Sequence, residues 1–495
     1  MPYHTLVKHR EIVDSLFESC QSNIVTILTG LMGSGKSLYA YSMVELYEDS
    51  IKKVVIGTPL REHRDDVFRR IGRKDRLLLQ SKVEVCLRHV CRGDILYDTA
   101  MCAECKLKRK CDFFTILNTV RSDSTKSFCV ITTHDCVSVV YPHAQLVIMD
   151  DFDVQLHRIR LYSKQYVEDF LSKLSYKQRE AVSRVLREAF IESKLAVRKE
   201  TSEYVIEEYY VSKPLDISNR TAYRPHLLIS ATIPTISTST SREEIEKLLE
   251  REYDDVMFDI IANFLFGLCS GILHLYLQAG EDLKLNIIKL KSLFRSDRIF
   301  VYRHRIYMGE TWAVNTAIKY TVEIANRALA MGKSVGILLP NKRIKARVMK
   351  DIKPSSKCKM IVVGDRESRG LNIDKDVIIA WYQHPYPKTE IYDGVNRIVM
   401  QLGTYLLLPY RLYYGEKIME VIEDWLFKTI VYAENVQSLF RFIRRWWKEH
   451  IVILLDYRLY DALRWFKPTH EYLLFNKVNV YSSIVELFED VKNFI

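Results

Sequence analysis

The sequence predicts an α/β fold with parallel sheets, organised as two units. The first observation is a set of short, continuous apolar stretches rich in β-branched residues, a pattern typical of strands buried in a parallel sheet. The second is that helical patterns separate most of these stretches, as βαβ connections require. The stretches lie at 23–30, 52–59, 128–133, 144–150 and 226–232, and then at 333–340, 358–365 and 376–383. A Ser/Thr-rich break at 235–241 separates the two groups and marks a linker.

The composition is that of an ordinary globular protein, with 48% hydrophobic and 27% charged residues. The chain has 73 Lys and Arg against 62 Asp and Glu, and this net charge of +11 is compatible with a polyanionic partner without identifying one. The N-terminus carries no secretory pattern, so we expect a cytoplasmic protein. An apolar stretch at 260–277 is long enough to span a bilayer, but Asn263 and His274 within it favour a buried helix, and we expect no membrane association.

A phosphate-binding loop follows the first predicted strand. Residues 30–37 read GLMGSGKS and satisfy the pattern G-x-x-x-x-G-K-[ST] between a strand and a helix, which is the context that the motif requires. The glycines allow backbone N–H groups to point at phosphate oxygens, Lys36 would reach the β- and γ-phosphates, and the Ser37 hydroxyl would take one position on Mg²⁺. We therefore expect ATP and Mg²⁺ to bind here, with contacts from Gly30, Gly33, Ser34, Gly35, Lys36 and Ser37.

An acidic pair ends the predicted strand at 144–150, where the sequence from 146 reads LVIMDDFD. A phosphate-binding loop needs such a second site. Asp150 would hold the Mg²⁺ shell, and Asp151 would orient or deprotonate the attacking water. Together with Lys36, these two carboxylates are the expected catalytic residues for ATP hydrolysis.

Five of the ten cysteines fall within one segment of 26 residues, at positions 86, 91, 102, 105 and 111. Clustered cysteines in a chain without a secretory signal favour metal binding over disulfides. Four thiolates from one short segment are able to hold a [4Fe–4S] cluster or a Zn²⁺ ion, and the spacing alone does not separate the two.

The order of these features resembles the XPD/DinG-type iron–sulfur helicases of superfamily 2. The phosphate-binding loop comes first, then the cysteines, then the acidic pair, then Ser230-Ala231-Thr232 after a strand. The resemblance implies two RecA-like P-loop domains with ATP between them. It places the first domain at 1–75, 121–153 and 223–236, a cysteine-rich Fe–S insertion at 76–120, a helical arch-like insertion at 154–222, and the second domain with helical additions at 237–495.

The same resemblance implies a function. It predicts an ATP-dependent helicase or translocase that acts as a monomer on single-stranded or forked DNA, travels 5′ to 3′, and unwinds duplex with the Fe–S insertion as a wedge. It favours [4Fe–4S] over Zn²⁺, with Cys86, Cys102, Cys105 and Cys111 as ligands. Cys91 is the fifth thiol and an alternative to Cys86 or Cys102.

The sequence departs from this family at two motifs. Residues 391–411 resemble the last motif, Q-x-x-G-R-x-x-R, with Gln401 at its start as a nucleotide contact, but Thr404 and Leu407 stand where its arginines belong. Arg397 is the expected replacement for stabilising charge on the γ-phosphate, and Arg366, Arg369 and Arg411 are alternatives. The acidic motif reads DDFD instead of D-E-A-H, so Asp153 stands where the family has histidine.

These departures keep two other functions open. One is a nucleic-acid-stimulated ATPase without unwinding activity, and the other is a non-enzymatic DNA-binding protein with a zinc module. The stretch RFIRRWWKEH at 441–450 mixes arginine with tryptophan, which is typical of stacking on single-stranded bases and equally of an amphipathic helix that buries its tryptophans.

Overall fold

The structure is a computed structural model. It describes the backbone of residues 10–22, 25–30, 34–122, 126–151, 161–198, 204–212, 226–230, 285–290, 294–295, 298–306, 309, 311–363, 373–383, 431–443, 449–465, 473–474 and 478–495.

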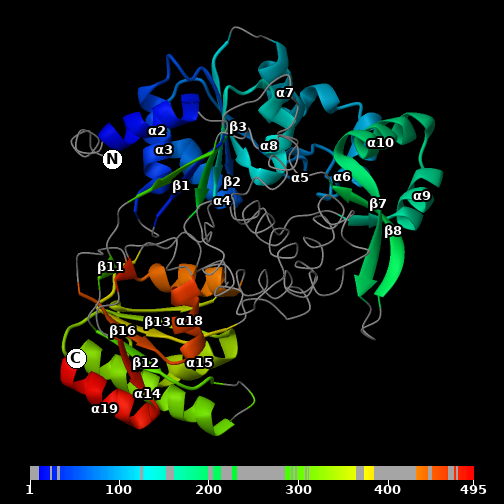
Figure 1. Cartoon of the computed structure of the whole chain (residues 1–495). Coiled ribbons are helices and arrows are strands. Elements are labelled where there is room, and N and C mark those ends of the chain that lie inside the picture. The colour runs from blue at the N-terminus through cyan, green and yellow to red at the C-terminus, as the bar shows by residue number, and fades with distance from the viewer. Residues whose placement is uncertain are drawn as a thin grey trace, which may run out of the picture.

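A seven-stranded parallel sheet forms the first lobe (Figure 1). Its strand order is β10-β1-β9-β5-β2-β4-β3, so the strand that leads into the phosphate-binding loop lies near the strand that carries the acidic pair. All its pairings are parallel. The strands are β1 (Val25–Thr29), β2 (Lys53–Thr58), β3 (Arg76–Leu79), β4 (Phe128–Thr133), β5 (Leu146–Asp150), β9 (His226–Ser230) and β10 (Leu285–Lys289).

Apolar residues of the central strands explain the burial of this sheet. Strands β4 and β5 are buried along their whole length, and one core cluster joins them to helix α2 (Arg10–Ser22) and helix α3 (Lys36–Leu46). Continuous apolar strands require cover on both faces, and helices provide it. The remaining helices of this lobe are α4 (Arg61–Arg70), α7 (Asp112–Ser122) and α8 (His134–Val140).

The segment predicted as a helical insertion at 154–222 contains a sheet as well as helices. Helices α9 (Lys164–Ser172) and α10 (Tyr176–Ala189) are present, but they accompany an antiparallel sheet of order β6-β8-β7. Its strands are β6 (Leu161–Ser163), β7 (Phe190–Arg198) and β8 (Tyr204–Ser212). The expected helices are therefore present, but the three strands were not expected, because a long hairpin of mixed charged and apolar residues resembles a charged helix in sequence.

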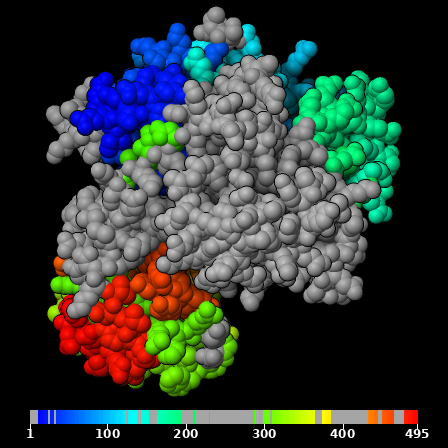
Figure 2. Space-filling view, viewed as in Figure 1, coloured from blue at the N-terminus to red at the C-terminus, as the bar shows by residue number. Residues whose placement is uncertain are grey.

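The unit of residues 161–212 packs against the cysteine-rich segment. Helix α6 (Ile95–Ala103) buries Leu96 and Ala100 against Val167, Val182 and Leu186 of the two helices. Two hydrogen bonds between side chains add to this contact, from Tyr162 to Asp94 at 2.8 Å and from Ser175 to Glu104 at 2.6 Å. Figure 1 shows α6 beside α10, and Figure 2 shows this unit at one side of the molecule in teal and green. The two segments thus share one apolar core.

A six-stranded parallel sheet forms the second lobe, with the order β14-β13-β15-β16-β12-β18. The strands are β12 (Ile299–Tyr302), β13 (Val335–Leu339), β14 (Cys358–Val362), β15 (Val377–Ala380), β16 (Ile451–Leu454) and β18 (Val478–Tyr481). The helices are α14 (Thr311–Ala330), α15 (Lys342–Asp351), α18 (Tyr457–Trp465) and α19 (Ile484–Phe494), and residues 431–440 are also helical. A small pair of β11 (Phe294–Arg295) and β17 (Leu473–Leu474) lies apart from this sheet.

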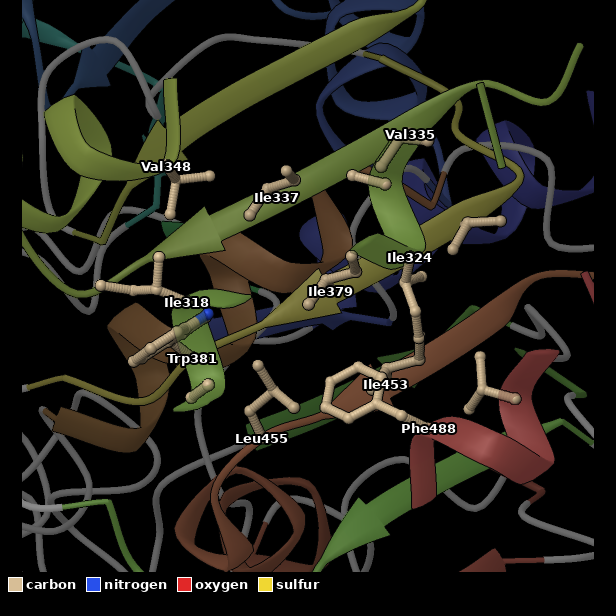
Figure 3. Close-up of a cluster of buried hydrophobic side chains, with 14 of the residues drawn as sticks. Ile318, Ile324, Val335, Ile337, Val348, Ile379, Trp381, Ile453, Leu455 and Phe488 are labelled. Carbon is tan, nitrogen blue, oxygen red and sulfur yellow. The ribbon is translucent and has the colours of Figure 1, made fainter. Parts of the chain in front are cut away.

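The core of the second lobe lies between this sheet and α14, α15 and α19 (Figure 3). Trp381, just after β15, is 1% exposed and donates its indole N–H to Thr321 Oγ1 at 3.2 Å. A buried indole requires such a partner for its polar atom. This lobe therefore has an apolar core of its own, separate from that of the first sheet.

The path of the chain corrects one predicted domain boundary. Strand β10 pairs with β1 in the first sheet although residues 237–495 were assigned to the second domain, because the chain returns to cover the edge beside the phosphate-binding loop. Within the described ranges, no helix is long and apolar enough to cross a membrane. The apolar stretch at 260–277 lies outside the described residues.

Candidate nucleotide site and cysteine pocket

The phosphate-binding loop leaves β1 and enters α3, as its sequence predicts. Gly35 has φ of +87°, a left-handed conformation that favours glycine. At Gly30 a Cβ atom would come within 3.0 Å of Leu290 Cβ and Ser34 Oγ, so the close packing of β10 against the loop requires glycine. Lys36 is 7% exposed, and its Nζ donates to the Gly30 carbonyl at 2.9 Å. The lysine side chain therefore lies against the backbone of the loop in which it is expected to bind phosphate.

Two hydroxyl groups, one at the end of β1 and one in the loop, have unused hydrogen-bonding capacity. Thr29 Oγ1 and Ser34 Oγ are buried and have no hydrogen-bond partner among the residues that the structure describes. Buried polar atoms rarely remain in that state, since each costs free energy. A polar ligand in the loop would satisfy them, which fits the chemistry of a bound phosphate chain.

The acidic strand meets the loop through Asp150, which is 1% exposed. Ser37 Oγ donates to Asp150 Oδ1 at 3.0 Å, and the Tyr41 hydroxyl donates to Asp150 Oδ2 at 2.6 Å. Since the carboxyl ends of parallel strands meet at one edge of a sheet, residues 113 positions apart come into contact. A serine hydroxyl beside a carboxylate is the arrangement that a Mg²⁺ ion on a nucleotide requires.

Two histidines that sequence reasoning missed flank the acidic pair. His63 Nε2, from the first turn of α4, lies 3.4 Å from Asp150 Oδ2 and is 31% exposed. His134 Nε2, from the start of α8, lies 2.8 Å from the Asp150 carbonyl oxygen, so this nitrogen carries the proton and donates it. His134 directly follows β4, which ends at Thr133, and His63 lies a few residues after β2, which ends at Thr58. This position after the carboxyl end of a strand is the sequence signal that could have identified them.

Asp151 occupies a strained corner of the site. Its φ is +49°, a left-handed conformation that is uncommon for aspartate. Burial raises the pKa of Asp151, and the negative charge of Asp150 raises it further. The positive charges of His63, Lys36 and Arg441 lower the same pKa, but the net shift is upward. A carboxylate of raised pKa is better suited to accept a proton from water near neutral pH. Arg441 comes from the second lobe.

The cysteine pocket is built by the local backbone. The N–H groups of Cys105, Lys108 and Cys111 each donate to the carbonyl three residues earlier, at 3.4, 3.1 and 3.3 Å. These turns fold the segment back on itself, and Cys102, Cys105, Lys108 and Cys111 all line the same pocket. All five cysteines of the segment line this one pocket, with Lys82, Arg88 and Lys108 among its walls.

Cys86 has the environment of a thiolate. Burial would raise the pKa of its thiol, but backbone N–H groups of Cys91, Val90 and Arg88 lower the pKa to about 7. Cys91 contacts the thiols of both Cys86 and Cys102, and burial raises its pKa well above the ordinary value. Cys111 Sγ lies 4.0 Å from the Val85 carbonyl oxygen. Over the part of the chain that the structure describes, no three Cys, His, Asp or Glu side chains are arranged to hold a single metal ion.

The structure brings part of the predicted site together. At one edge of the first sheet lie Gly30, Ser34, Gly35, Lys36, Ser37, Asp150 and Asp151. The other predicted residues lie outside the described part of the chain: Gly33, Asp153, Ala231, Thr232, Arg366, Arg369, Arg397, Gln401, Thr404, Leu407 and Arg411.

Comparison with known proteins gives distant structural likenesses only. No protein-family model matches the chain, and no curated protein matches it. The chain is similar to a structure described as apo XPD, with 14% identity, coverage of 95% of this chain and 100% of that one, and a TM-score of 0.45. It is similar to Xpd4 of S. tokodaii at 11% identity, 96% and 99% coverage and a TM-score of 0.44. At this level of similarity, the α/β fold with two parallel sheets rests on the strand order and pairing of the chain itself.

Proposed function

We propose that the chain is an ATP-dependent helicase or translocase that acts on single-stranded DNA. The observation that carries this proposal is the contact of Ser37 with Asp150 at 3.0 Å, beside Lys36, at the carboxyl edge of a parallel sheet. This is the arrangement of a nucleotide-hydrolysing P-loop site. Direction of travel and preference for DNA come from the sequence resemblance and are part of the proposal.

The residues divide the work of hydrolysis as follows. Backbone N–H groups of the loop and Lys36 Nζ would bind the phosphates. Ser37 and Asp150 would hold Mg²⁺, which would supply positive charge to the phosphate oxygens. Asp151 accepts a proton from the attacking water, whose oxygen bonds to the γ-phosphorus while the bond to the β-phosphate oxygen breaks. The raised pKa of Asp151 supports this role.

The second lobe contributes positive charge to the same site. The positive charge of Arg441 lowers the pKa of Asp151, although burial and Asp150 outweigh it. We propose that Arg441, or Arg397 as expected from the sequence, stabilises charge on the γ-phosphate from the second lobe. Such a contact would make closure of the two lobes depend on the nucleotide.

We propose a [4Fe–4S] cluster on Cys86, Cys102, Cys105 and Cys111, with Zn²⁺ as the alternative. The pocket has five thiols that are able to bind iron, and the cations of Lys82, Arg88 and Lys108 would balance the negative charge of a sulfur-ligated cluster. The preference for the cluster over zinc comes from the sequence resemblance, because four thiolates suit either centre. When bound, the cluster would cross-link the segment from 86 to 111.

Strand displacement tests the motor activity directly. With ATP and Mg²⁺, the wild type should release the short strand of a duplex carrying a 5′ single-stranded tail, and much less from a 3′-tailed duplex. Lys36→Ala should release neither. ATP hydrolysis stimulated by single strands without displacement would support the non-unwinding ATPase instead, and the absence of hydrolysis would support the non-enzymatic alternative.

The absorbance of anaerobically purified protein tests the cofactor. A brown protein with a broad visible band that is lost in Cys102→Ser would support the cluster. A colourless protein with one zinc per chain would overturn it in favour of the alternative.

A further inference from the structure

Helix α4 carries two consecutive side chains that serve different sites. His63 contacts the acidic pair, with its Nε2 3.4 Å from Asp150 Oδ2. Arg64, the next residue, turns the other way and is 1% exposed. Because consecutive helical residues point about 100° apart, one helix is able to contact two neighbouring sites at once.

Arg64 is held by a two-point ion pair with Glu84. Its Nη1 and Nη2 each donate to one Glu84 oxygen at 2.9 Å, and its Nε donates to Asp65 at 2.8 Å. Bidentate pairing fixes the orientation of both groups, which a lysine does not reproduce. Any rotation of α4 about its axis therefore carries the Glu84 carboxylate with it.

Glu84 lies in the short helix that leads into the cysteine pocket, between two residues that line it. It lies on helix α5 (Lys82–Val85), where it also accepts hydrogen bonds from the N–H and hydroxyl of Ser81, at 2.9 and 2.8 Å. Cys86 directly follows this helix, and both Lys82 and Cys86 line the pocket. The Val85 carbonyl faces Cys111 Sγ at 4.0 Å. A displacement of Glu84 would thus move one side of the thiol pocket.

We propose that α4 couples the nucleotide site to the cysteine pocket, with His63 as the positioning residue at one end and the Arg64–Glu84 ion pair at the other. This inference rests on the proposed nucleotide site. Nucleotide binding at Asp150 moves His63 and α4, and the ion pair transmits the movement to residues 81–86. Both ends are physically continuous, since the two linking residues are adjacent in one helix.

Amide hydrogen exchange with and without Mg²⁺ and a slowly hydrolysed ATP analogue tests the coupling. In the wild type, the nucleotide should slow exchange in a peptide spanning 26–42 and should change the exchange rate in a peptide spanning 80–92 by at least about fivefold. Arg64→Lys should keep the first effect and lose the second. The readout does not depend on catalytic activity.

Arg61 provides a matched control. It lies on the same helix and faces the same carboxylate, with its Nε 3.6 Å from Glu84 Oε2, but its side chain is 55% exposed. Exposed pairs of this kind contribute little, so Arg61→Lys should respond to the nucleotide as the wild type does. If Arg64→Lys disrupts the fold, His63→Ala breaks the other end of the link at a partly exposed position and should also lose the change at 80–92.

The outcomes separate the two proposals. A nucleotide response at 80–92 that survives both Arg64→Lys and His63→Ala would overturn the coupling, as would a wild type protected at 26–42 but unchanged at 80–92. No protection at 26–42 in the wild type would overturn the nucleotide site itself and the coupling with it.

Discussion

At the scale of single residues, Asp150 is the point where the loop, the sheet and α4 meet. Its two carboxylate oxygens have different partners, Ser37 on one side and Tyr41 and His63 on the other. The carboxylate is therefore oriented before any ligand binds. Preorganised charge of this kind costs no rearrangement during the reaction.

Tyr41→Phe should weaken Mg²⁺ binding. The variant loses the 2.6 Å hydrogen bond to Asp150 Oδ2, a charged-partner bond worth about 1.5–3 kcal/mol, and the carboxylate becomes free to rotate. We expect the Mg²⁺ concentration for half-maximal ATP hydrolysis to rise about tenfold. Tyr47→Phe is the matched control, because Tyr47 makes a bond of the same length to Asp14, away from the site. An equal effect in both variants would contradict the role of Tyr41.

Glu84 should make the stability of the protein depend on pH. Burial would raise its pKa, but Arg64 and Ser81 hold the pKa at about 2, below the ordinary value of 4.5. Because the unfolded chain takes up the proton first, the stabilisation is complete above about pH 4.5 and is lost as the pH falls towards 2, on the order of 2 kcal/mol in all. Melting temperatures of wild type and Glu84→Gln should converge as the pH is lowered. A constant difference from pH 3 to pH 6 would refute this account.

At the scale of elements, Gly57 in β2 allows α8 to approach the sheet. A Cβ atom there would lie 2.6 Å from Val137 Cγ2, 3.0 Å from Met149 Sδ and 3.2 Å from His134 Cδ2. The glycine therefore sets the position from which His134 supports the carbonyl of Asp150. Strand β2 thus shapes the acidic corner although it contributes no catalytic group itself.

Gly57→Ala should destabilise the first lobe by about 1–3 kcal/mol through overpacking, and should lower hydrolysis further by displacing His134. Gly72→Ala is the control, since a Cβ atom there meets only Glu45 at an ordinary 3.5 Å. Thermal unfolding and ATP hydrolysis of the two variants measure these effects. Equal melting temperatures for both variants would show that the contact at Gly57 is not tight.

The sequence predicted those elements whose local pattern is unambiguous. Strands such as β4 and β5 are continuous apolar runs, buried throughout, and all eight predicted strands are present. The strands that were missed are β3, β6, β7, β8, β10, β11, β12, β16, β17 and β18. Several of them are short, and a brief apolar run such as Ile451–Leu454 of β16 does not by itself distinguish a strand from a buried helix. In β7 and β8 charged and apolar residues are mixed, so long-range pairing decides their structure. The geometry of the cysteine pocket was equally beyond sequence, since it depends on successive three-residue turns.

At the scale of the whole molecule, the phosphate-binding loop and the acidic pair could be predicted because each motif is contiguous. Tyr41 and Arg441 could not, since no motif marks either residue, and His63 is marked only by its position after the carboxyl end of a strand. Tyr41 and His63 join Asp150 to α3 and to α4 through direct contacts. The proposed nucleotide site is therefore built from several elements of the first lobe.

Steady-state ATP hydrolysis, with and without a single-stranded oligonucleotide, tests the central claim most directly. The wild type should hydrolyse ATP in the presence of Mg²⁺ and faster with the oligonucleotide, and Lys36→Ala should lower the rate at least about a hundredfold under both conditions. A wild type that does not hydrolyse ATP, or a rate that Lys36→Ala leaves unchanged, would contradict the account.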